Sequence, residues 1–115
     1  MPVVLLCRSA KVGDELLREV VAKLPAIVAE HLTVPENHLT ELTPADISIR
    51  VQDSQFNVVE GDLDVLIIAT KFEARILTGQ LRTDDMAAAV QGLLPPGMKG
   101  FVWVTLVDAF FSAFH

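Results

Sequence analysis

The sequence is poor in cysteine and in basic residues. Cys7 is the single cysteine among 115 residues, so no disulfide can form within the chain and nothing requires an oxidising compartment. Nine Lys and Arg stand against fifteen Asp and Glu, for a formal net charge of −6. This acidic balance argues against nucleic acid and against anionic membrane surfaces as partners.

Long apolar runs are also missing. No segment approaches the roughly 20 apolar residues that a membrane-spanning helix needs. The apolar stretch that follows Met1 is about five residues long and has no basic residues before it, too little for a signal peptide. We therefore expect a soluble, cytoplasmic protein.

Patterns that would hold a metal or a cofactor are absent as well. His31, His38 and His115 are dispersed, with no cysteine or carboxylate at metal-ligand spacing, so we expect no metal site. There is no glycine-rich phosphate loop, and no histidine is placed in a known motif to activate Ser9 or Ser54.

Hydrophobic residues, in contrast, are abundant. They make up 51% of a chain whose length fits one domain, spanning residues 1–115. This exceeds what such a domain usually needs for its own core, so part of the apolar surface is expected to lie between subunits. The aromatic tail at 109–115 fits the same expectation, because it has too many phenylalanines for a solvated terminus.

The apolar patterns predict a chain of alternating strands and helices. The tail aside, the expected order is strand, helix, strand, strand, helix, strand, at residues 3–7, 14–30, 46–53, 63–75, 82–94 and 100–108. Pro25 should kink or restart the first helix, and Thr83 is a candidate N-cap of the second.

An internal echo suggests two related halves. "ISIRVQDSQF" at 47–56 matches "VWVTLVDAFF" at 102–111 in pattern, at a constant offset of 55. Two βαβ units would explain this, and the right-handed crossover rule makes the strand pair of each unit parallel. We expect an α/β fold in which a four-stranded sheet carries two helices on one face.

A Met-Pro start on a chain of this pattern resembles the tautomerase superfamily. "AKLPAIVAEHLTVP" at 22–35 and "LDVLIIATKFEAR" at 63–75 are similar to parts of 5-carboxymethyl-2-hydroxymuconate isomerase. "SIRVQDSQFNVVEG" at 48–61 is similar to the second strand and turn of 4-oxalocrotonate tautomerase. The resemblance implies a homotrimer without a cofactor that tautomerises or isomerises a small 2-oxo acid, with the C-terminal strand reaching a neighbour.

The resemblance makes Pro2 the catalytic general base. An apolar pocket would lower the pKa of its secondary amine below the ordinary α-amino range of about 7.7–8.0, so that the neutral amine could take up a proton at neutral pH. Methionine is normally removed when the next residue is small. While Met1 is attached, the nitrogen of Pro2 is acylated and not basic. A proline at the start of a strand is also common without any catalytic role.

Three basic side chains are candidates for binding the substrate carboxylate. Arg50 lies in the second strand and could hold a carboxylate by two hydrogen bonds, or could be a surface arginine paired with Asp53 or Glu60. Arg75 matches a second arginine of the isomerase, or is a solvated strand end. Lys11 lies near the place of an arginine in 4-oxalocrotonate tautomerase.

Two aromatic residues are candidates for the apolar wall of the same pocket. Phe56 and Phe111 each follow a predicted strand, although aromatic residues at such spacings are more often part of the core. Two other functions stay open at this point. One is a non-catalytic trimer of the same fold that binds a ligand or a protein partner, and the other is a small α+β ligand-binding domain outside the superfamily.

Overall fold

A computed structural model describes residues 2–34, 41–53, 61–108, 110 and 112–114. Phe56 and Phe111 lie outside these residues. The elements in chain order are β1 (Val3–Arg8), α1 (Asp14–Leu32), the short 3₁₀ turn η2 (Pro44–Asp46), β2 (Ser48–Asp53), β3 (Leu63–Thr70), α2 (Glu73–Leu77), α3 (Gly79–Gln91) and β4 (Gly100–Val107).

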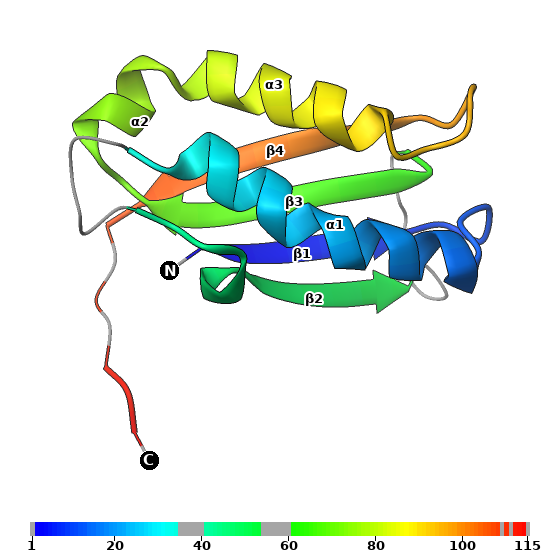
Figure 1. The fold of residues 1–115 in the computed structure, drawn as a ribbon, viewed down its shortest axis with the longest axis horizontal. Helices are drawn as coiled ribbons and strands as arrows, with labels where there is room; N and C mark the ends of the chain where they lie inside the picture. The colour runs from blue at the N-terminus through cyan, green and yellow to red at the C-terminus, as the bar shows by residue number, and fades with distance from the viewer. Residues whose placement is uncertain (1, 35–40, 54–60, 109, 111, 115) are drawn as a thin grey trace.

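The strands form one sheet in the order β2-β1-β3-β4. β1 pairs with β2 and β3 pairs with β4 in parallel, whereas the central pair β1 and β3 is antiparallel. The helices lie over one face of the sheet (Figure 1). Two parallel halves joined at an antiparallel seam confirm the predicted α/β fold of two βαβ units.

The core lies between the helices and one face of the sheet. Alternate residues of the central strands, such as Val4 and Ile67, point to the helices and are fully buried against Leu24 and Val28 of α1. The other face is open in the single chain, where the side chain of Trp103 in β4 is 62% exposed. In the single chain, β1 and β4 are therefore covered on one face only.

The boundaries of two predicted elements were wrong, and the restart considered at Pro25 does not occur. The third strand ends at Thr70, not at Arg75, because its partner β4 ends at Val107 and Phe72 is already the N-cap of the new helix α2. The hydroxyl of Thr83 donates to the carbonyl of Gly79 inside α3, so Thr83 is not an N-cap. α1 continues through Pro25 without a restart.

One finding concerns membranes. No helix among the described residues is long and apolar enough to cross a bilayer.

Candidate active site

Pro2 is fully buried at the start of β1. Its carbonyl accepts a hydrogen bond from the amide of Ser48 at 3.3 Å, which extends the pairing of β1 with β2 by one residue. Because side chains alternate along a strand, Pro2 lies on the same face as Val4 and Leu6, the face that the helices cover. The local surroundings of Pro2 are therefore apolar.

The end of the molecule around Pro2 gathers several chain segments. The last residues of α1, β3 and β4, together with α2, all lie at this end (Figure 1). Extending the β1–β3 register by one residue places Pro2 opposite Ala69, which in turn pairs with Leu106. Leu106 is two strand spacings from Pro2, about 10 Å. Pro2, Ala69 and Leu106 thus form a row across the sheet beneath the helices.

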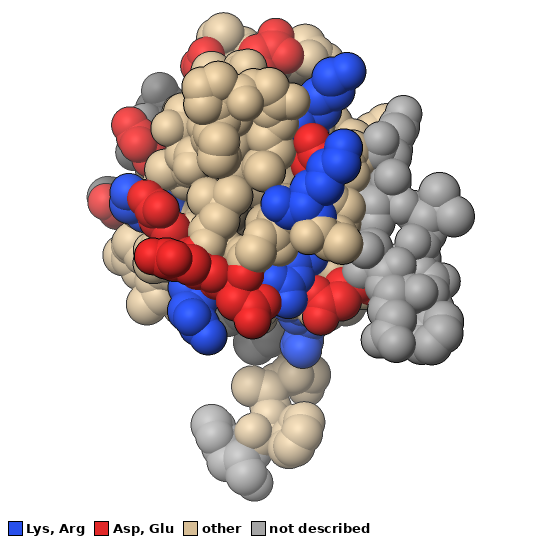
Figure 2. Space-filling view, turned by 90° about the vertical axis from the view of Figure 1, so that its right-hand side faces the viewer, with Lys and Arg blue, Asp and Glu red and all other residues tan. Residues whose placement is uncertain are grey.

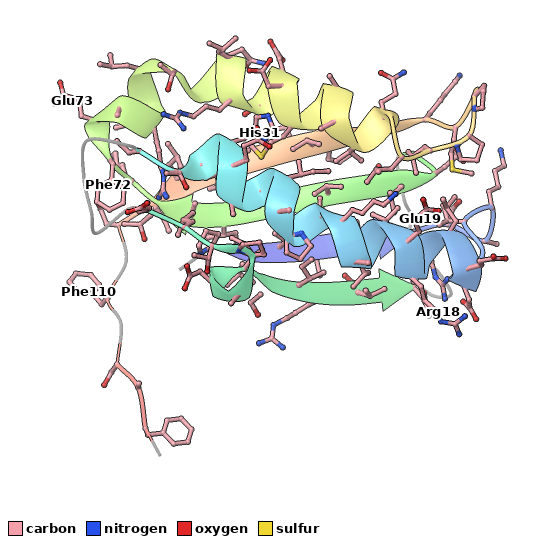
Figure 3. All side chains as sticks on the ribbon, in the orientation of Figure 1. Arg18, Glu19, His31, Phe72, Glu73 and Phe110 are labelled. Atoms are coloured by element: carbon pink, nitrogen blue, oxygen red, sulfur yellow. The ribbon has the colours of Figure 1, made fainter. Side chains whose placement is uncertain are left out.

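Arg75 lies at the same end, and its side chain is deeply buried. The residue is 3% exposed, and its Nε donates to the carbonyl of Leu32 at 3.0 Å and its Nη1 to the carbonyl of Thr70 at 2.8 Å. Its guanidinium lies 5.0 Å from the ring centroid of Phe72 (labelled in Figure 3). Burial lowers the pKa of Arg75, and the positive charge of Arg82 acts in the same direction. Arg75 is therefore not the solvated strand end that one interpretation predicted; it joins the end of α1 to the end of β3.

Arg82 is a candidate that sequence reasoning missed. Its Nη1 donates to the carbonyls of His31 at 2.7 Å and Thr33 at 3.0 Å, and its Nε donates to Thr78 Oγ1 at 2.6 Å. The one signal in the sequence is that a second arginine follows Arg75 after seven residues. That signal gives no hint that the partners lie on α1.

A pocket of about 210 Å³ opens beside the two arginines. It is lined by Leu32, Arg75, Gly79, Gln80, Arg82, Thr83, Val104 and Leu106. Pro2 does not line it, but Leu106 belongs both to this pocket and to the row that begins at Pro2. The pocket therefore begins at Leu106, the last residue of the row that starts at Pro2.

Arg50 lies elsewhere in the single chain. It pairs with Leu5 on β1, so it belongs to the open face of the sheet, whereas Pro2 faces the helices. It is also three residues further along the sheet, about 10 Å. Within one chain the structure does not bring Arg50 and Pro2 together.

Lys11 lies at the opposite end of the molecule, beyond the end of β1, with its Nζ 3.8 Å from the carboxylate of Asp62. Figure 2 looks onto this end and shows acidic and basic side chains side by side. There Arg8 forms ion pairs with Asp14 at 2.7 Å and with Asp53 at 2.5 Å. The hydrogen bond from Arg8 lowers the pKa of Asp14. Arg8 and Lys11 thus have acidic partners of their own at this end.

No three His, Cys, Asp or Glu side chains come together as a metal site would need, among the residues that the structure describes. The pocket near the Pro2 end instead offers the guanidinium groups of Arg75 and Arg82, with Gln80, Thr83 and aliphatic side chains.

No protein-family model matches the sequence, and no curated protein matches it either. Solved structures do match. A macrophage migration inhibitory factor-like protein from Entamoeba histolytica is 13% identical, with 94% of this chain and 88% of that chain covered at a TM-score of 0.61. FG41 malonate semialdehyde decarboxylase inhibited by 3-bromopropiolate is 13% identical, covering 92% and 83% at a TM-score of 0.64. The symmetric trimer of a wild-type fused 4-OT is 12% identical, covering 92% and 85% at a TM-score of 0.60.

This chain has the tautomerase-superfamily fold. The similar structures include proteins named for different reactions, so the likeness gives the fold and not the reaction. The expectation of an α+β domain outside this fold is not supported by these matches.

Proposed function

We propose that the protein is a tautomerase or double-bond isomerase of a small 2-oxo or 2-hydroxy-enoic acid, with the amine of Pro2 as the general base. The base would take a proton from one position of the substrate and return it at another. Such a reaction only moves a proton, so no cofactor takes part in it.

The observation that carries this proposal is the burial of Pro2 among apolar residues at the end of the sheet that also holds Arg75. Burial disfavours a cationic amine, so the freed amine of Pro2 would have a pKa below its ordinary value and be neutral near pH 7. Arg75 bonds to Thr70, the residue that follows Ala69 opposite Pro2. A cationic group near the base adds to this effect and would also attract a substrate carboxylate.

The mechanism requires that Met1 be removed, because an acylated proline nitrogen has no basic lone pair. Once Met1 has been removed, the proline ring holds the lone pair of the secondary amine in a fixed direction at the end of β1. An arginine that binds the carboxylate would stabilise the enolate that forms when the proton leaves.

We also propose a homotrimer. One of the similar structures is a symmetric trimer, and the open face of this sheet carries exposed apolar side chains, including Trp103. Arg50 and Lys11 would serve the Pro2 site only if a neighbouring copy supplied them. Phe56 and Phe111 keep their proposed role as apolar wall residues.

The test is the ketonisation of 2-hydroxymuconate or phenylenolpyruvate by untagged protein. The intact mass must first show that Met1 is gone. We expect a rate well above that in buffer, and a loss of about 100-fold or more in Pro2→Ala, as expected when a general base is removed. Pro96→Ala, which changes an exposed proline in the turn between α3 and β4, should keep the full rate.

A different function would follow from two other results. If Met1 is retained, Pro2 cannot act as the base and the proposed reaction is wrong. If the processed protein gives no rate above buffer with either substrate, the proposed reaction is wrong for 2-hydroxymuconate and phenylenolpyruvate. The second candidate, a non-catalytic trimer that binds a ligand or a protein partner, would then be favoured. The observation behind this candidate is that Pro2 does not line the pocket beside Arg75.

A further inference from the structure

Arg75 and Arg82 form a pair of like charges without an acidic partner. The ion pairs found among the described residues are made by Arg8, Lys11 and Lys23, and neither Arg75 nor Arg82 takes part in one. Both arginines instead bond to backbone carbonyls at the end of α1. A helix end offers only about half a negative charge. Two full positive charges at this place are therefore under-compensated.

Each guanidinium also keeps one nitrogen without a hydrogen-bond partner. Arg75 and Arg82 use Nε and Nη1 for their protein contacts, and neither Nη2 has a partner among the described residues. No buried side-chain nitrogen in the described part of the chain is left without a partner. The two Nη2 groups must therefore reach solvent, and the pocket that both arginines line is the place where a ligand can meet them.

The pocket combines these donors with an apolar floor. Leu32, Val104 and Leu106 supply aliphatic surface, and the volume of about 210 Å³ fits a ligand of a few carbon atoms or one aromatic ring. The contacts to α1 and β3 hold both guanidinium groups in place before any ligand arrives, which lowers the entropic cost of binding. Planar guanidinium groups match the geometry of a carboxylate.

We propose that the Arg75–Arg82 pocket binds the carboxylate of a small ligand with a short apolar body, and that Arg82 sets this preference together with Arg75. The inference deepens the proposed function, since Arg75 belongs to both, and it rests on that function only where the ligand is taken to be the substrate. Binding at the pocket requires no turnover and no free Pro2 amine.

The test is an NMR titration of the full chain with sodium benzoate, with benzamide as a neutral ligand of the same shape. The backbone amide signals of Gly79, Gln80 and Thr83 should shift and saturate with benzoate. Those of Gln91 and Met98, which line a separate pocket at the other end of α3, should not. Benzamide, or sodium chloride at equal concentration, should leave all of these signals in place. Shifts that are absent, scattered or equally large with benzamide would overturn the proposal.

Variants assign the effect to Arg82. Arg82→Gln removes the charge and should weaken benzoate binding about tenfold or more, the range for a lost charge-assisted hydrogen bond. Arg18→Gln makes the same change in net charge at an exposed position near the start of α1 (labelled in Figure 3) and should bind benzoate as the wild type does. An unchanged affinity in folded Arg82→Gln would exclude its role. If that variant does not fold, the wild-type titration decides.

The two proposals fail separately. Benzoate binding without ketonisation would leave the pocket standing and remove the proposed reaction. Ketonisation that depends on Pro2, without binding of benzoate at Gly79, Gln80 and Thr83, would retain the reaction and remove the pocket.

Discussion

Arg75 occupies a different environment from the one its sequence position suggests. As the last residue of "KFEAR" at 71–75, it could end a strand in solvent or bind a ligand. The structure instead shows its side chain buried beneath the end of α1. The deciding partner, Leu32, is 43 residues away in the sequence. Pro2 and Arg75 could be singled out from the sequence because they belong to a recognisable pattern. Arg82 could not, because its partners His31 and Thr33 lie 51 and 49 residues away.

Replacing Arg75 by lysine should destabilise the protein. A lysine keeps the charge but has a single nitrogen, which cannot reach both Leu32 and Thr70 in the fixed geometry of a guanidinium. Losing one charge-assisted bond in a buried place should lower the free energy of unfolding by about 1.5–3 kcal/mol. Urea denaturation followed by circular dichroism measures this.

Arg18→Lys is the matched control, since Arg18 is exposed on α1, and its effect should stay within about 0.5 kcal/mol. Equal stabilities of the two variants would mean that the contacts of Arg75 do not hold α1 to β3.

At the scale of elements, the start of β4 depends on a single residue without a side chain. Gly100 pairs with Leu63 on β3, and a Cβ at this position would overlap the carbonyl oxygen of Leu63. Gly61 also lies so close that a Cβ on it would come within 2.8 Å of the Cα of Gly100. The sequence shows a glycine near the start of each strand, but only the pairing shows that these glycines let β3 and β4 meet.

Gly100→Ala should therefore destabilise the protein by about 2 kcal/mol or more, because backbone atoms of the paired strands would have to move apart. Gly79→Ala is a contrasting control at the first residue of α3, where nothing lies within 4 Å of the added Cβ. There alanine should raise the free energy of unfolding by about 0.5 kcal/mol. Thermal and urea denaturation of both variants give the comparison, and a Gly100→Ala protein as stable as the wild type would contradict the pairing.

At the scale of the whole molecule, two of the uncovered apolar surfaces in the described part of the chain bear on assembly. One is the open face of the sheet, with Trp103 and Ile68 among its exposed side chains. The other is the tail, where Phe110 stands away from the body of the protein and is fully exposed (Figure 3). The predicted packing of the tail does not occur within its own chain for Phe110 and Phe114. Burying such surfaces between copies would account for the high hydrophobic content of the sequence.

The trimer proposal can be tested by analytical ultracentrifugation. We expect a species of three times the 12.6 kDa chain, and a shift to smaller species in Trp103→Asp, which would put a charge into the buried face. Leu77→Asp changes an exposed leucine of α2, away from the open face, and should leave the assembly intact. A wild-type monomer at micromolar concentration would contradict the trimer.

The sequence by itself determined the order of the strands and helices along the chain and the two parallel halves. These features follow from local periodicity and from the handedness of βαβ connections, which act within a few tens of residues. Only the tertiary structure decided where β3 ends, that Arg50 and Lys11 lie apart from Pro2 within one chain, and that Arg75 and Arg82 share a pocket. These outcomes depend on contacts between residues far apart in the chain, because the end of α1 supplies the carbonyls that hold both arginines.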